Sequence, residues 1–172
     1  FETEGYEGSF EEIKYWLDEI SPDYIVGSVH HMAGIELDTS PDTYAQCAKA
    51  YGGVDALYET YFDAQLTLLK AFEPAVVGHF DLVRIFDDNY SQRMIRPSIW
   101  DKIERNLHFI KEKNLILDFN LRALTKGQPE PYVCESILAK AIEIGISIVP
   151  GDDSHGIQLV GNHWDKGISI LK

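Results

Sequence analysis

The stretch Ala75-Val76-Val77-Gly78-His79 joins a short apolar run to a histidine. It follows Pro74, where a long helical pattern stops, and it has the length and the apolar character of a buried strand. Three other runs of this kind lie at residues 24–30, 115–119 and 146–149. Short apolar strands that alternate with helical patterns predict an α/β fold, in which a parallel sheet is covered by helices.

Helical periodicity fills the intervals between these strands. Apolar residues at steps of three and four predict helices over about 10–20, 43–51, 57–72, 98–110 and 134–144, and a short one near the C-terminus. Ser9 with Glu12 predicts a capping box for the first helix, and Ser40-Pro41 predicts an N-cap followed by proline for the second. The compositions of residues 87–97 and 121–131 are typical of loops.

Composition and charge exclude several classes of protein. The chain has 172 residues, of which 45% are hydrophobic and 25% charged, so it is neither disordered nor of low complexity. Its longest apolar runs are far shorter than the roughly 18 residues that a membrane-spanning helix needs. The formal net charge of −13 disfavours binding to nucleic acid or to an anionic membrane. We therefore expect neither nucleic acid nor a membrane as a partner.

The cysteine content and the first residues suggest where the chain belongs. Cys47 and Cys134 are too few for a disulfide framework, and the sequence shows no leader of the signal-peptide kind, so we expect a cytoplasmic protein. The chain opens on Phe1 rather than on methionine. We expect residues 1–172 to form a single domain that is truncated at its N-terminus.

Polar residues, most of them able to bind a metal ion, follow each predicted strand. In a parallel α/β sheet the carboxyl ends of the strands meet at one edge, so these residues should converge there. Mixed histidine and carboxylate ligands suit Zn, Mn or Fe. The residues at the strand ends are His30, His31, His79, Asn120, Arg122, Asp153 and His155.

Simpler interpretations apply to several of these residues. One histidine at a strand end is more often a hydrogen-bonded structural residue than a ligand. His163 lies in a loop, where it either contacts a substrate or caps the last helix, and His108 is interpreted as an ordinary helix residue. In the acidic N-terminal stretch Glu2 is the candidate ligand, with Glu4 as the alternative.

Three stretches resemble successive metal motifs of the polymerase and histidinol phosphatase (PHP) superfamily, and in particular of its monofunctional histidinol-phosphatases. They are Gly27-Ser28-Val29-His30-His31, Val77-Gly78-His79-Phe80-Asp81-Leu82 and Gly151-Asp152-Asp153-Ser154-His155. The resemblance implies part of a distorted (β/α)7 TIM-like barrel with two or three divalent metal ions. It implies that His30 and His79 bind metal with Glu2, that Asp153 completes another metal's shell and that His155 binds a third. The family's opening His-x-His motif is absent from the chain.

The resemblance also implies a reaction, the hydrolysis of the phosphomonoester L-histidinol phosphate in histidine biosynthesis. His79 and Asp153 would serve catalysis through the metals, and Arg122 would hold phosphate oxygens, with Lys126 as a second cation. His31, Asn120 and His163 would also contact the substrate. Three alternatives remain open at this point: another PHP phosphoesterase with different phosphomonoesters or nucleotides as substrates, a catalytically incomplete fragment, and a purely structural α/β domain.

Overall fold

The computed structural model describes residues 1–6 and 8–172, and a parallel five-stranded sheet lies at its centre. The strands lie side by side in the order in which they occur along the chain. They are β1 (Glu2–Glu4), β2 (Val26–Ser28), β5 (Val76–Val77), β6 (Ile116–Asn120) and β7 (Ser147–Gly151). A separate antiparallel hairpin, β3 (His31–Met32) with β4 (Ile35–Glu36), follows β2. The parallel α/β fold expected from the sequence is confirmed.

Helices lie between successive strands of the parallel sheet, and α8 follows the last strand. The four longer connecting helices are α1 (Ser9–Ile20), α2 (Pro41–Ala50), α3 (Val54–Phe72) and α5 (Pro97–Glu112). The others are α4 (Tyr90–Met94), α6 (Arg122–Thr125), α7 (Glu135–Glu143) and α8 (Trp164–Leu171), with one 3₁₀ turn, η1 (Leu82–Arg84). Among the described residues, no helix has both the length and the apolar character that crossing a membrane requires.

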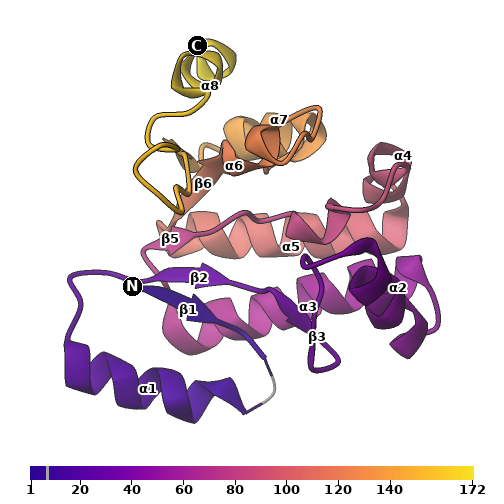
Figure 1. The fold of residues 1–172 in the computed structure, drawn as a ribbon, viewed down its shortest axis with the longest axis horizontal. Coiled ribbons are helices and arrows are strands. Elements are labelled where there is room, and N and C mark those ends of the chain that lie inside the picture. Colours follow the sequence, from indigo (N-terminus) through magenta and orange to yellow (C-terminus); the bar gives the residue numbers. More distant parts are fainter. Residues whose placement is uncertain (7) are drawn as a thin grey trace.

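The strand order determines on which side the helices lie. Each crossover between neighbouring parallel strands is right-handed as a rule, so a sheet wound in one direction keeps its helices on one face. Figure 1 shows α1, α3, α5 and α7 following one another from bottom to top beside the sheet. This one-sided winding is the arrangement of a (β/α) barrel, and it leaves the opposite face of the sheet for a site.

The two faces of the sheet differ in burial. Val77, Leu117 and Phe119 face the helices and are at most 1% exposed. On the opposite face Ile116 is only partly buried and Val149 is 42% exposed. The apolar runs suggested strands that are buried on both faces, but the described residues cover only the helix side. The face of the sheet opposite the helices, called the inner face below, is therefore accessible at the strand ends.

Short elements depart from the expectation. The segments predicted as loops contain α4 and α6, which have five and four residues and thus no helical periodicity to detect. The capping box predicted at Ser9 is wrong: Gly8 takes the N-cap position, and the Ser9 hydroxyl bonds to the backbone of Tyr6 instead. The cap at Ser40 is confirmed, since its side chain accepts a hydrogen bond from the Thr43 backbone.

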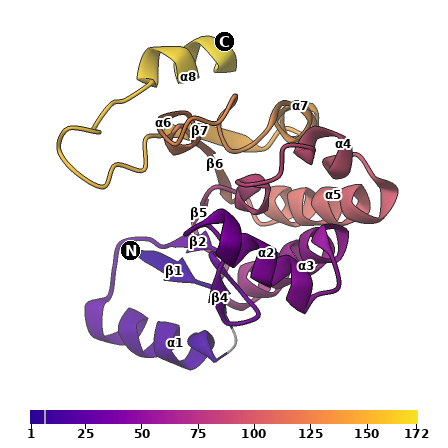
Figure 2. The same ribbon diagram turned by 45° about the vertical axis from the view of Figure 1, so that its right-hand side comes forward.

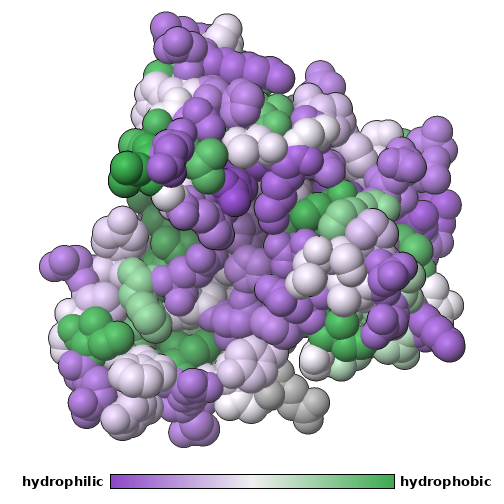
Figure 3. Space-filling model, in the orientation of Figure 1, coloured by the Kyte–Doolittle hydropathy of each residue, from purple (hydrophilic) through white to green (hydrophobic). Residues whose placement is uncertain are grey.

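The loop between β7 and α8 is exposed, whereas α8 itself packs on the fold through Gly167 and Leu171. Figure 2 shows the connection from β7 to α8 looping outward before the last helix. Ile157 and Val160 in this loop are 87% and 67% exposed. In Figure 3 hydrophobic atoms lie on the surface over this loop, and hydrophilic residues gather around a hollow in the middle of the same view. The accessible polar surface thus lies in the middle of the molecular surface seen in Figure 3.

Both cysteines are expected to resist alkylation in the folded protein. Cys47 and Cys134 are free and buried, and burial raises the pKa of Cys134 to about 12 and that of Cys47 above its ordinary value. The reactive thiolate is therefore scarce at neutral pH. Iodoacetamide labelling followed by mass spectrometry should give slow modification under native conditions and rapid modification in urea. Fast native labelling of Cys134 would contradict the packing described above.

Candidate metal centre

Three side chains from different strand ends offer a common set of ligand atoms. Glu2 lies at the start of β1, His30 two residues after β2, and His79 two residues after β5. One ligand atom from each lies within 4.8 Å of the others. The rings of His30 and His79 have centroids 4.6 Å apart, and His79 Nε2 lies 3.3 Å from Glu2 Oε1. Two imidazoles and a carboxylate at this spacing can hold one divalent metal ion.

The electrostatics around Glu2 favour its charged form. Partial burial raises its pKa, but hydrogen bonds from His79 and Ser28 and the charges of His79 and His30 outweigh burial and lower the pKa to about 2. The ring of His79 is buried, and its Nδ1 has no hydrogen-bond partner among the described residues. An ionised carboxylate beside an unsatisfied imidazole is a donor set that a metal ion would complete.

A cavity of about 360 Å³ on the inner face joins this group to residues from later strands. Sheet register explains the convergence, because Val26 pairs with both Glu2 and Val76, and Asp118 pairs with Val149. The candidate site residues that line the cavity are Glu2, His79, Asn120 and Asp153, together with Asp118. The predicted convergence of strand ends is thus present in the fold.

Asp118 is a site residue that the sequence reasoning missed. Its carboxylate accepts hydrogen bonds from Asn120 Nδ2 at 2.8 Å and from the His79 backbone N–H at 3.5 Å. Burial raises the pKa of Asp118 to about 6 despite these bonds. The strand period of two offered a signal, because Asp118 must share a face with Asn120. It was missed because residues 115–119 are mostly apolar and were interpreted only as a buried strand.

Asp153 and His155 occupy different surroundings. Asp153 Oδ2 lies 3.4 Å from Asn120 Nδ2, within the cavity, and its backbone has a φ of +46°, which non-glycine residues adopt rarely. His155 has a side chain that is 65% exposed, and its Nδ1 lies 2.9 Å from the Asp153 carbonyl oxygen. Among the described residues, His155 is outside the Glu2-His30-His79 group.

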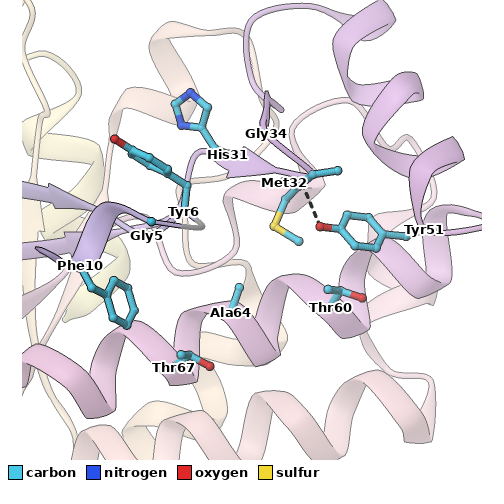
Figure 4. Close-up of a pocket in the computed structure, with 12 residues that line it drawn as sticks. Gly5, Tyr6, Phe10, His31, Met32, Gly34, Tyr51, Thr60, Ala64 and Thr67 are labelled. Carbon is cyan, nitrogen blue, oxygen red and sulfur yellow. Dashed lines mark hydrogen bonds between the residues drawn. The ribbon is translucent and has the colours of Figure 1, made fainter. Parts of the chain in front are cut away.

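His31 lines a second cavity, of about 420 Å³. Figure 4 shows its ring beside Tyr6 at the edge of this cavity, with α3 forming the opposite wall. The ring centroids of His31 and Tyr6 are 5.6 Å apart. Tyr51 Oη accepts a hydrogen bond from the Ala33 backbone and so ties the β3–β4 turn to the end of α2. The His31 ring thus faces a different cavity from the metal group, although its Nδ1 lies 3.3 Å from Oε1 of Glu4, the carboxylate that also contacts the His30 ring.

The remaining predicted substrate contacts have distinct partners. The backbone N–H of Arg122 donates to Asn120 Oδ1, while its Nε is buried with no partner among the described residues. Lys126 Nζ lies 3.1 Å from Asp38 Oδ2, so its charge is already paired. His163 occupies the N-cap position of α8, but its exposed side chain makes no capping hydrogen bond. Of the three, only Arg122 has an unused buried donor.

Gly78 is expected to be essential for the geometry of this centre. A Cβ at this position would lie 2.5 Å from Ser28 Oγ, which in turn donates to Glu2 Oε1. Gly78→Ala should displace this pair and lower zinc affinity by about tenfold, a loss typical of disturbed metal surroundings. Gly5→Ala is the matched control, since its Cβ would meet its neighbours at an ordinary 3.4 Å. Equal zinc affinities in the two variants, measured by calorimetry, would refute this role.

Comparison with known proteins gives one consistent family. A family model described as the PHP domain matches residues 3–122. A "Probable histidinol-phosphatase" of Schizosaccharomyces pombe is 31% identical over 95% of this chain and 54% of its own length. The "Histidinol-phosphatase" of Saccharomyces cerevisiae is 31% identical over 83% of this chain and 50% of its own length. The chain thus spans about half the length of these two fungal relatives.

Bacterial proteins give the same result at the level of sequence and of structure. The "Histidinol-phosphatase" of Bacillus subtilis is 30% identical over 93% of this chain and 64% of its own length. A crystal structure from Listeria monocytogenes, described as that of a candidate histidinol phosphatase, superposes with a TM-score of 0.86 at 27% identity. That similarity covers 96% of this chain and 66% of the Listeria chain. The fold is therefore shared over nearly all of the residues.

Proposed function

Because this chain belongs to the PHP domain family, we propose that it carries the metal centre of a phosphatase that hydrolyses L-histidinol phosphate to L-histidinol and phosphate. The observation that carries the proposal is the group of Glu2, His30 and His79, with ligand atoms within 4.8 Å of one another. The names of the relatives support the choice of substrate. Among the described residues this group has the donors for a divalent ion.

We assign the metal ligands as follows. Glu2, His30 and His79 hold one ion, Asp153 completes the shell of another, and His155 binds a third. These residues would hold two or three divalent ions such as Zn, Mn or Fe, which when bound would lower the pKa of a water and neutralise phosphate oxygens. The chain's own contribution is to hold these donors at the start of β1 and just after β2, β5 and β7. Asn120 supports the second set, because its side-chain amide reaches both Asp118 and Asp153.

Cationic side chains would hold the substrate. The buried and unpaired Nε of Arg122 is the donor best suited to a phosphate oxygen. Lys126 would join it only after separating from Asp38, which would then be free to meet a cationic group of the substrate. His31 and His163 remain proposed substrate contacts at the edge of the site.

The net charge of −13 disfavours nucleic acid and membranes as partners. An anionic small molecule would be repelled by the same charge, and bound divalent ions would offset that repulsion at the site. Free thiols at Cys47 and Cys134 fit a cytoplasmic location.

The test is phosphate release from L-histidinol phosphate in the presence of Mn or Zn, beside a nucleoside monophosphate and p-nitrophenyl phosphate. We expect hydrolysis of L-histidinol phosphate to be the most efficient, together with bound metal in elemental analysis. Asp153→Ala should lower the rate by at least about 100-fold, because it removes a proposed ligand and loss of a residue that only supports a ligand already costs about 10–100-fold. Asp165→Ala, at an exposed position of α8, is the control that should not. Equal rates for wild type and Asp153→Ala would exclude the assignment of Asp153, and preference for another phosphomonoester would exclude the substrate.

A further inference from the structure

Glu4 makes a set of contacts that the proposed metal ligands do not explain. It stands two residues after Glu2 on β1, so the two side chains share one face of the strand. Glu4 Oε1 accepts hydrogen bonds from the backbone N–H groups of His30 at 2.7 Å and His31 at 3.2 Å. Its other oxygen, Oε2, contacts Nδ1 of the His30 ring. One carboxylate thus fixes both the backbone and the side chain of His30.

These contacts decide which nitrogen of His30 remains available. A neutral imidazole has one N–H donor and one acceptor nitrogen. A carboxylate accepts but does not donate, so contact with Glu4 places the ring proton on Nδ1 and leaves the Nε2 lone pair free. The His30 ring lies beside His79, within the ligand group that includes Glu2. Glu4 is not in that group, so its action on a metal ion passes through His30.

We propose that Glu4 is a positioning residue, which holds the His30 ring in the orientation and tautomer that present Nε2 to the metal ion. The inference rests on the proposed metal centre and adds to it a residue outside the ligand set. Carboxylates that accept from a ligating histidine fix its orientation and raise its basicity. The Glu4 side chain is 25% exposed and that of His30 is 24% exposed, so water competes little for this contact.

A simpler role for Glu4 is to hold the chain after β2 through the two backbone N–H groups. The variant Glu4→Gln separates the two roles. Its amide oxygen can still accept from the His30 and His31 backbone, whereas its NH₂ group would face Nδ1 in place of Oε2. A donor at that point forces Nδ1 to accept, which moves the ring proton to Nε2 and blocks the ligand position. The backbone contact is kept and the tautomer is reversed.

The experiment measures the tautomer and the metal affinity of the protein. Long-range ¹H–¹⁵N spectra of the metal-free protein, recorded where His30 is neutral, should show the proton on Nδ1 in the wild type and on Nε2 in Glu4→Gln. Zinc titration should show a 10–100-fold loss of affinity in Glu4→Gln. Glu19→Gln, an exposed change on α1, should leave both unchanged. Thermal unfolding of all variants reports whether the fold is retained.

The outcomes separate this inference from the metal centre itself. If Glu2→Gln and His79→Ala weaken zinc binding but Glu4→Gln does not, the centre stands and the positioning role of Glu4 is wrong. If none of the three variants weakens zinc binding, the centre itself is wrong, and the role of Glu4 is overturned with it. A wild-type His30 ring with its proton on Nε2 would also overturn the inference. A reversed tautomer with weakened binding would support it.

Discussion

Replacing His79 with alanine is expected to lower phosphate release and metal content together, the rate by at least about 100-fold. Loss of a residue that only supports a ligand costs about 10–100-fold, so loss of a ligand should cost no less. His79 is 5% exposed, contacts Glu2 and has a φ of +21°, and such a strained conformation at a site suggests that function requires it. Steady-state phosphate release and elemental analysis measure the two effects.

His108→Ala is the matched control for this prediction. It removes the same chemical group from an exposed position on α5, away from the strand ends. We expect its rate and metal content to equal those of the wild type. If His79→Ala kept the metal content of the wild type but released phosphate more slowly, His79 would act on the substrate and not as a ligand. If it retained both, the proposed centre would be wrong.

Arg84→Met is expected to lower the free energy of unfolding by about 3–5 kcal/mol, because it leaves the buried carboxylate of Asp81 without its cation. Both side chains are fully buried, and Arg84 Nε donates to Asp81 Oδ2 at 2.9 Å. The guanidinium also donates to the carbonyl oxygens of Glu130 and Pro131, and its Cζ lies 4.7 Å and 4.6 Å from the ring centroids of Tyr90 and Tyr132. It thus fastens the segment after α6 to the turn that follows His79. Urea unfolding followed by circular dichroism measures the loss.

Two comparisons show whether burial is the cause. Arg105→Met removes one end of an exposed pair with Asp63 and should cost at most about 1 kcal/mol. In the double variant Asp81→Leu/Arg84→Met no buried charge is left alone, so its cost should be smaller than the sum of the two single changes. A loss below about 1 kcal/mol in Arg84→Met itself would show that the pair is not stabilising in the way proposed.

Local patterns determined much of the fold. The apolar run at residues 75–77 and the stripe that ends at Phe72 depend on neighbouring residues alone, and both elements are found in the structure. Polar residues directly after strands predicted that His79, Asn120 and Asp153 would meet, and they line one cavity together with Glu2, which stands at the start of β1. Parallel strands bring their carboxyl ends to one edge whatever the details of packing, which is why this inference needs only the element order.

Other features depended on tertiary structure. Nothing in the local sequence distinguishes Glu2 as a member of the ligand group from Glu4 as a contact of His30, because both stand on the same face of β1. Asp118 lies within an apolar run and shares a face with Asn120 by the strand period, but only the tertiary structure brings its carboxylate to the His79 backbone. The sequence by itself determined the longer helices, four of the five parallel strands, their order and the edge at which the site would form, because these follow from periodicity and chirality. The tertiary structure alone decided the role of each polar group, because a role depends on the distance between atoms that are far apart along the chain.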